Sequence, residues 1–172
     1  PSTAAVTPPA GWTLIRRVDN PNTTDHSLLT WRRTAAAGEP ASHTFTLSAS
    51  TGSAGGIAAF LRVDPASPIV VEDGVNTPSS LAHAAPSVVP AIGETMLVTL
   101  HAFSSTGTWT PPAGMLEAFD QGSQAGPVAA GISLTCAYAL NASSGATGAR
   151  TATAANDADV GNTASIVLRR AP

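Results

Sequence analysis

Residues that could form a hydrolytic centre occur in this chain, but their spacing does not fit one. A serine nucleophile in a Gly-x-Ser-x-Gly turn needs serine in the middle position, whereas the segment 122–126 has Gln124 there. A glycosidase needs two carboxylates roughly 5 to 9 Å apart, and the 11 Asp and Glu residues are spread thinly along the chain. Glu39 and Glu94 each lie beside turn residues, where a solvated position explains them. The sequence therefore predicts no catalytic residues and a protein that is not an enzyme.

Two loops rich in side-chain oxygens are the best candidates for a metal site. They are Asn156-Asp157-Ala158-Asp159 and the loop with Asp19, Asn20, Asn22 and Asp25. Calcium prefers about six to eight oxygen ligands, more than either loop supplies, and Asx side chains also stabilise turns without an ion. The four histidines, His26, His43, His83 and His101, are isolated in the sequence, which favours structural roles. We expect no metal and no cofactor.

Aromatic side chains are candidates for sugar binding, because an exposed ring can stack on the face of a sugar. The candidates are Trp12, Trp31, Trp109 and Tyr138. Tyr138 has the phase of a core residue, and Trp12 follows a turn and is expected to pack inward. Trp109 follows a loop at 104–108 and is the one ring whose position allows exposure, although core packing is favoured over sugar binding for these rings. Trp109 is therefore the only candidate ligand-binding residue.

The composition narrows the range of partners. The 172 residues carry a net charge of −3, and all eight basic residues are arginine. The arginine pairs 16–17, 32–33 and 169–170 lie in expected strands, so each pair points to opposite faces. Without a clustered basic surface, nucleic acid is not an expected partner. No apolar stretch approaches 18 residues, so no membrane insertion is expected, and the single cysteine, Cys136, is expected to be a small buried hydrophobe.

Alternation of apolar and polar residues with a period of two predicts antiparallel strands. The alternating runs are 43–47, 57–63, 95–103, 132–140 and 164–168. Met96, Val98, Leu100 and Ala102 share one face of their run, and the run 132–140 is expected to have one solvated face. The Ala-rich pieces at 34–37 and 82–85 could form short helical turns. The pattern predicts about ten strands in an all-β, antiparallel, jelly-roll-like sandwich.

The chain contains an internal repeat. Thr7-Pro8-Pro9-Ala10-Gly11-Trp12 recurs as Thr110-Pro111-Pro112-Ala113-Gly114-Met115, at an offset of 103 residues. Thr44 and Thr46 match Thr151 and Thr153 at an offset of 107, and residues 55–62 match 161–169 at 106 to 107. We therefore expect a single domain, residues 1–172, built from related halves at about 1–75 and 85–172 that pack face to face.

The repeat also predicts a missing strand. In the second copy the strand 95–103 precedes the Pro-Pro turn, whereas only Pro1 to Val6 precede it in the first copy. An unpaired sheet edge exposes backbone donors, so we expect either upstream residues or another subunit to fill the position by strand addition. A chain that opens at Pro1 is itself expected to be processed or to be part of a longer polypeptide.

The motifs of both halves resemble a known type of module. Pro8 to Arg17, Trp31-Arg32, Gly38 to Leu47, Ala54 to Ile57, Arg62 to Asp64 and Pro111 to Met115 carry the likeness, which covers nearly the whole chain. It is similar to β-sandwich modules of tail, fibre and other virion-surface proteins of phages of high-GC bacteria, and of large secreted proteins of those bacteria. The resemblance implies a fold and supplies no binding residues.

These observations together lead to an expected function. We expect a non-enzymatic structural subunit of an extracellular assembly, namely a phage tail, fibre, capsid-surface or decoration protein in the virion. Its expected partners are other copies of itself or other subunits of the assembly, joined through strand addition and apolar contacts. The alternative is a carbohydrate-binding or adhesive module of a secreted bacterial protein, with a cell-surface glycan as its partner.

Overall fold

The prediction of an all-β protein is confirmed by the structure. The computed structural model describes residues 4–20, 26–49, 52–125, 130–141 and 143–172. These residues form strands and irregular segments and contain no helix, hence none that could cross a membrane. The strands are β1 (Val6–Thr7), β2 (Thr13–Asn20), β3 (His26–Arg32), β4 (Thr46–Leu47), β5 (Ile69–Ser80), β6 (Ala82–Ala85), β7 (Thr95–Phe103), β8 (Trp109–Thr110), β9 (Leu116–Gly122), β10 (Ser133–Asn141), β11 (Arg150–Ala154) and β12 (Asp159–Leu168).

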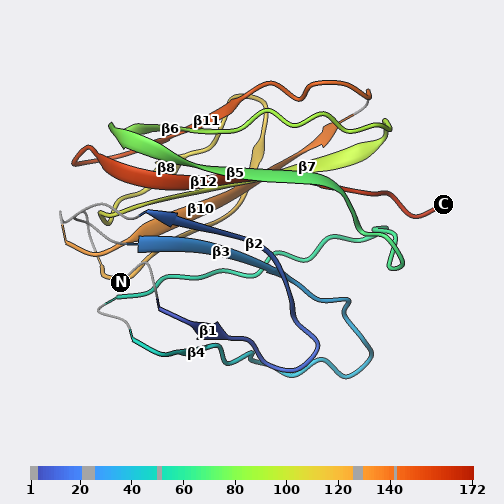
Figure 1. Cartoon of the computed structure of the whole chain (residues 1–172), viewed down its shortest axis with the longest axis horizontal. Helices are drawn as coiled ribbons and strands as arrows, with labels where there is room; N and C mark the ends of the chain where they lie inside the picture. Colours follow the sequence, from blue (N-terminus) through green and yellow to red (C-terminus); the bar gives the residue numbers. More distant parts are fainter. Residues whose placement is uncertain (1–3, 21–25, 50–51, 126–129, 142) are drawn as a thin grey trace.

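A five-stranded antiparallel sheet lies in the middle of the molecule (Figure 1). Its strand order is β5-β12-β7-β10-β9, and β7 is its central strand. The three-stranded sheet β6-β11-β8 covers one face, so that the residues from Ile69 onward form a β-sandwich. Leu97, Ala137 and Val167 of the central sheet pack there in one apolar cluster with Val88 and Met115. These side chains follow the period of two, which places every second residue of a strand on the same face.

The N-terminal residues cover the other face of the central sheet. The hairpin β2-β3 lies directly on it, and the short pair β1-β4 forms a further layer outside the hairpin (Figure 1). Leu28 of β3 packs with Ala102, Leu134 and Ala164 of the central sheet. The solvated face predicted for 132–140 is wrong, because its small side chains lie under the sheet β6-β11-β8, where Ala137 packs with Val88 and Met115. The hairpin covers the apolar face of the same strand, so both of its faces are buried.

The turns of the repeated Pro-Pro motif have the same structure in both halves. The amide of Trp12 donates to the carbonyl of Pro9 at 3.4 Å, and the amide of Met115 donates to that of Pro112 at 3.0 Å. Gly11 and Gly114 follow with φ angles of 84° and 75°, a left-handed conformation that glycine adopts without steric cost. The prolines hold the preceding segment extended, so each motif turns one short strand into the next long one.

The strand pairing repeats with the offsets found in the sequence. Thr7 pairs with Thr46 between β1 and β4, and Thr110 pairs with Thr153 between β8 and β11. The hairpins β2-β3 and β9-β10 share the same irregularity, since each leaves one residue of its first strand unpaired in a β-bulge. The unpaired residues are Ile15 and Ala118, again 103 positions apart. The first half therefore reproduces β8, β9, β10 and β11 as β1, β2, β3 and β4.

Some predicted elements differ from the structure. The strand 95–103 is confirmed with the same bounds as β7, and 132–140 and 164–168 lie almost wholly in β10 and β12. The strand predicted at 43–47 is limited to β4, and 57–63 forms no strand, with only an isolated bridge between Val63 and Arg170. Residues 82–85 form β6 and not a helical turn, because they pair with β11.

Gly161 of β12 and its sequence equivalent Gly55 differ sharply in the space around them. A Cβ on Gly161 would lie 2.4 Å from Nδ1 of His83 and 2.7 Å from the carbonyl oxygen of Ala102, whereas one on Gly55 would meet nothing within 4 Å. We expect Gly161→Ala to lower the free energy of unfolding by about 1–3 kcal/mol, since the added methyl must displace packed neighbours. Gly55→Ala is the matched control and should change it by less than about 0.5 kcal/mol. Urea denaturation measures both, and equal effects would contradict the close approach of β12 and His83.

Candidate functional site

The candidate catalytic carboxylates lie in separate ion pairs. Glu39 accepts hydrogen bonds from Arg33 at 3.1 Å and from the amide of Ala36 at 2.8 Å, and that amide is the main reason why the pKa of the Glu39 carboxyl is lowered. Glu94 is exposed and pairs with Arg170 at 2.7 Å. The two carboxylates therefore have different arginine partners, Arg33 for Glu39 and Arg170 for Glu94.

The oxygen-rich loops show turn geometry. Asn156 and Asp157 both have positive φ angles, of 73° and 25°, and the Asn156 side chain donates to the Asp157 carboxylate at 3.4 Å. Of the other loop, Asn22 and Asp25 lie outside the described residues. Within the described ranges, no group of three or more His, Cys, Asp or Glu side chains could hold a metal ion.

Trp109 is a core residue, which agrees with the packing favoured for it and not with the alternative of an exposed ring. The side chain is only 5% exposed, its ring packs edge-on against Phe103 at 5.0 Å, and its Nε1 donates to Ser133 Oγ at 3.1 Å. Trp109 begins the two-residue strand β8, which is too short for its inward-facing phase to be read from alternation. A ring enclosed in this way offers no face to a sugar, so the structure gives Trp109 no support as a ligand-binding residue.

Two buried histidines lie beside Trp109, between the central and the three-stranded sheets. His83 and His101 are both 0% exposed. Nδ1 of His101 donates to the backbone carbonyl of His83 at 3.0 Å, and Nδ1 of His83 lies 2.5 Å from Thr77 Oγ1. Burial lowers the pKa of His101 to about 3 and also lowers the pKa of His83. These neutral rings are core residues, which agrees with the structural roles expected for them.

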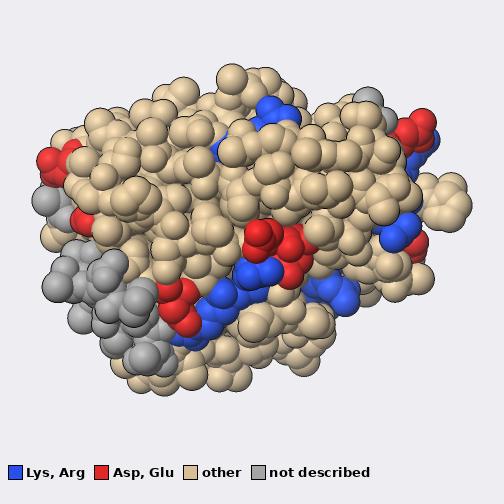
Figure 2. Space-filling model, turned by 45° about the horizontal axis from the view of Figure 1, so that its top comes forward, with Lys and Arg blue, Asp and Glu red and all other residues tan. Residues whose placement is uncertain are grey.

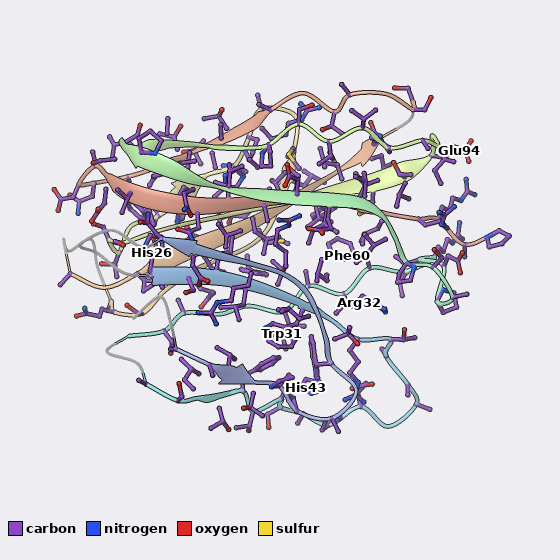
Figure 3. The ribbon with its side chains drawn as sticks, in the orientation of Figure 1. His26, Trp31, Arg32, His43, Phe60 and Glu94 are labelled. Atoms are coloured by element: carbon purple, nitrogen blue, oxygen red, sulfur yellow. The ribbon has the colours of Figure 1, made fainter. Side chains whose placement is uncertain are left out.

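A cluster of aromatic side chains that the sequence analysis did not assemble fills the space between β2-β3 and β1-β4. Trp12 packs edge-on against His43 at 5.1 Å and Phe45 at 5.3 Å, and Trp31 lies 6.0 Å from Phe45. Figure 3 shows Trp31 pointing away from the central sheet toward this cluster. The repeat could have revealed it, because Trp12, Trp31 and Phe45 occupy the positions of the core residues Met115, Ala137 and Ala152.

Ion pairs join the hairpin β2-β3 to the edge of the central sheet. Arg16 of β2 pairs with Glu72 of β5 and lies 3.5 Å from Asp73, while Arg17 pairs with Asp19 at 2.7 Å. Figure 2 shows acidic and basic side chains in contact with one another, and no large surface area of a single charge on the face in view. The bond with Glu72 raises the pKa of Arg16 further. The two arginines point to different partners, as expected for neighbours in a strand, and do not form a phosphate clamp.

The most unusual feature of the first half is one edge of β3. β10, the equivalent of β3, pairs with β9 on one side and with β7 on the other. Within the described part of the chain, β3 pairs with β2 alone, and no strand takes the place of β7. A strand with one bare edge presents a row of backbone donors and acceptors that can bind a further strand. This edge is the candidate functional site.

Side chains on both sides of this edge are incompletely covered. Leu100 of β7 is only half-buried on the face toward the first half, although Leu97 and Thr99 on the opposite face of the same strand are fully buried. Trp31 is half-buried, whereas its equivalent Ala137 is 0% exposed. A central strand normally loses its contact with water on both faces when both layers are complete. Leu100 is therefore less covered than Leu97 and Thr99, although Val98 and Ala102 on its own face of β7 are buried.

An extended segment, residues 53–61, also covers this face of the central sheet. Ala58 and Phe60 pack against Val98, Cys136 and Ile166 of the central sheet, and Figure 3 shows Phe60 between this segment and the layers above it. The alternate side chains, Ile57 and Leu61, are 61% and 90% exposed. The sequence match to β12 is consistent with this place, since β12 lies on the other side of β7 from β10.

The buried histidines predict how stability depends on pH. His101 has an unfolded pKa near 6.5 and a folded pKa of about 3, so protons bind preferentially to the unfolded chain between these values. The histidine's contribution to the free energy of unfolding is fully present above pH 6.5 and is lost as the pH falls toward 3, at about 1.4 kcal/mol per pH unit. His101→Asn should remove this part of the slope, as measured by urea denaturation between pH 6.5 and 4.5.

His101→Gln is the matched second variant, because it also removes the buried imidazole and leaves a neutral polar side chain. Both variants should show the same reduced dependence of stability on pH. A His101→Asn variant whose stability falls as steeply with acid as that of the original would show that the buried imidazole does not cause the effect.

Comparison with known proteins adds no relative to this description. No family model, no curated protein and no solved structure matches the chain. The open edge of β3 is therefore interpreted from its own geometry and from the complete copy of the same unit in the second half.

Proposed function

We propose that this chain is a non-enzymatic structural module of an extracellular assembly. The sequence resemblance suggests the surface, tail or fibre of a phage virion as that assembly. The module is incorporated by accepting a β-strand from outside residues 1–172 at the edge of β3, and by apolar contacts beside it. Its partners are other subunits of the assembly or further copies of the chain.

The observation that carries the proposal is the incomplete first half. The same sequence unit forms a closed sandwich in the second half and leaves one strand position open in the first. Backbone pairing supplies affinity in strand addition, and pockets for alternate side chains supply specificity. Exposed leucine and isoleucine side chains beside the open position add apolar area that a partner can bury.

A glycan-binding module is not proposed as a second function. That alternative depended on Trp109, whose ring is enclosed between two sheets. Trp12, Trp31 and Phe45 pack against one another between β2-β3 and β1-β4, with their rings edge-on or tilted, and do not form a flat platform.

Copy number in purified particles tests the proposed function. We expect the chain to occur at a fixed stoichiometric ratio to the major structural proteins, as measured by quantitative mass spectrometry of the particles. Leu61→Glu should reduce its incorporation at least about tenfold, since burying an unpaired carboxylate in an apolar contact is costly.

Leu140→Glu is the matched control, because Leu140 is similarly exposed, at 84% against 90% for Leu61, but lies in the complete half. This control should be incorporated like the original chain. Recovery of the protein only as a free monomer, never in particles, would refute a structural role. Equal incorporation of both variants would show that the exposed apolar side chains of residues 53–61 do not contribute to assembly.

A further inference from the structure

A polar cavity lies at the end of the sandwich where β7 and β9 finish and β10 and β12 begin. Its volume is about 350 Å³, and its polar lining consists of Thr106, Thr108, Asp120, Gln124 and Asn156. These residues come from the loop that follows β7, from the end of β9 and from the loop that leads into β12. A cavity of this size holds a side chain or a small ligand and is too small for a folded element.

The side chains of this cavity offer hydrogen-bond acceptors and one negative charge. The amide of Trp109 donates to one carboxylate oxygen of Asp120 at 2.7 Å, and no arginine or histidine in the described part of the chain pairs with that carboxylate. The amide nitrogens of Gln124 and Asn156 already donate to neighbouring oxygens, at 3.2 and 3.4 Å, which leaves their side-chain oxygens as acceptors. Partial burial raises the pKa of Asp120, because its ionised form loses contact with water. A guanidinium group, which carries only donors and a positive charge, fits this set.

Arg62 is an exposed cation at the opposite end of the molecule. Val63 forms its bridge with Arg170, beyond the last residue of β12, whereas the cavity lies near the first residue of β12, roughly 30 Å away along the strand. Among the described residues, none holds the Arg62 side chain by a hydrogen bond or an ion pair.

The turn that carries Arg62 is held in a fixed shape. Its φ of 60° lies in the left-handed region, which large side chains seldom adopt. The carbonyl of Arg62 accepts a hydrogen bond of 2.8 Å from the amide of Ala171, and the amide of Asp64 donates one of 3.0 Å to the carbonyl of Arg169. Leu61, directly before it, is 90% exposed. A rigid, projecting pair of this kind loses little conformational entropy when it binds.

The two ends of the molecule also differ in charge. Asp157 and Asp159 lie beside the cavity, in the loop before β12 and at its first residue. At the other end, Asp64 already accepts hydrogen bonds from two backbone amides, and Glu94, labelled in Figure 3, is paired with an arginine. The charge of Arg62 is therefore available, and opposite charges favour contact between one end of a copy and the other end of the next.

We propose that Arg62 of one copy enters the polar cavity of a second copy and pairs there with Asp120, so that copies of the chain join head to tail. This inference rests on the proposed structural function and names its partner as another copy of the same chain. The two contact surfaces differ, so association continues from copy to copy into a ring or a filament. Leu61 reaches the edge of the cavity together with Arg62, which gives its exposed side chain a place to be buried.

Sedimentation velocity of the whole chain tests the contact. We expect the original chain to form dimers, trimers and larger species as its concentration rises. Asp120→Asn and Arg62→Asn each remove one charge of the pair and should raise the dissociation constant at least about tenfold. Both variants should fold, because asparagine keeps an oxygen for the Trp109 amide at position 120 and tolerates the positive φ at position 62.

A mixture of the two variants gives the sharpest result. Asp120→Asn retains the arginine and Arg62→Asn retains the cavity, so an equimolar mixture should form dimers and nothing larger, although each variant alone stays monomeric. Asp157→Asn and Arg170→Asn are the matched controls, because they remove a charge at the same two ends outside the proposed pair. Each control should change the dissociation constant by less than about threefold.

Several results would overturn the proposal. They are an original chain that is monomeric at every concentration, self-association that both variants retain, and a mixture that forms species larger than dimers. Binding of arginine amide to the original chain and not to Asp120→Asn, without self-association, would assign the cavity to another molecule's cation and would also overturn the second copy as its partner. Purified particles separate this contact from the proposed function: incorporation of both variants at the original copy number would remove the contact alone, and head-to-tail association of a chain absent from particles would refute the function alone.

Discussion

The pairing of backbone groups along strand edges is the constraint on which this structure depends. Each buried amide and carbonyl needs a partner, since an unpaired one loses its bond to water without replacement. The central sheet meets this need with long ladders, in which β7 pairs along its whole length with β10 on one side and with β12 on the other. The first half repeats the same unit without a counterpart of β7 among the described residues, and there β3 pairs with β2 alone.

The two halves are joined through specific polar contacts as well as apolar packing. Asn162 of β12 is fully buried and donates a hydrogen bond of 2.6 Å to the carbonyl of Val18, and Asn76 of β5 donates one of 2.8 Å to that of Asp19. These bonds fix β2 over the edge of the central sheet, next to the ion pair of Arg16 with Glu72. The open position is thereby held at a set place above β7. A rigid acceptor of this kind loses little conformational entropy when a strand enters.

Alternation predicted most of the fold, because the period of two reports burial on a pleated surface. It gave the bounds of β7 and the shared face of Met96, Val98, Leu100 and Ala102, and the repeat gave the pairing offsets. The alternation within one strand does not show how many layers of sheet pack on it. A solvated face was therefore expected for β10. Alternation also predicted a strand at 57–63 whose side chains do alternate, but a strand needs a neighbour along its length, and among the described residues this segment has only the isolated bridge of Val63 with Arg170.

The candidate site was predictable to the extent that it follows from the repeat. The comparison of the two Pro-Pro motifs was enough to predict that a strand is missing before the first one. The position of the site above Leu100, and the layer that Trp12, Trp31 and Phe45 form beside it, required the structure because these contacts join residues far apart in the chain. Trp109 follows a loop in the sequence, so its local context left exposure open, and the tertiary packing shows the ring enclosed.

The two halves solve the same packing problem with different side chains. In the second half, the small residues Ala137 and Ala152 let the three-stranded sheet approach the central sheet closely, and both are fully buried. In the first half, Trp31 and Phe45 stand at these positions under an outer layer of two short strands. Large rings can fill a wider gap beneath a small layer, and burying a large aromatic side chain contributes more free energy than burying alanine. Because these rings are only half-buried with the strand position vacant, an incoming strand would gain the free energy of covering them in addition to its backbone pairing.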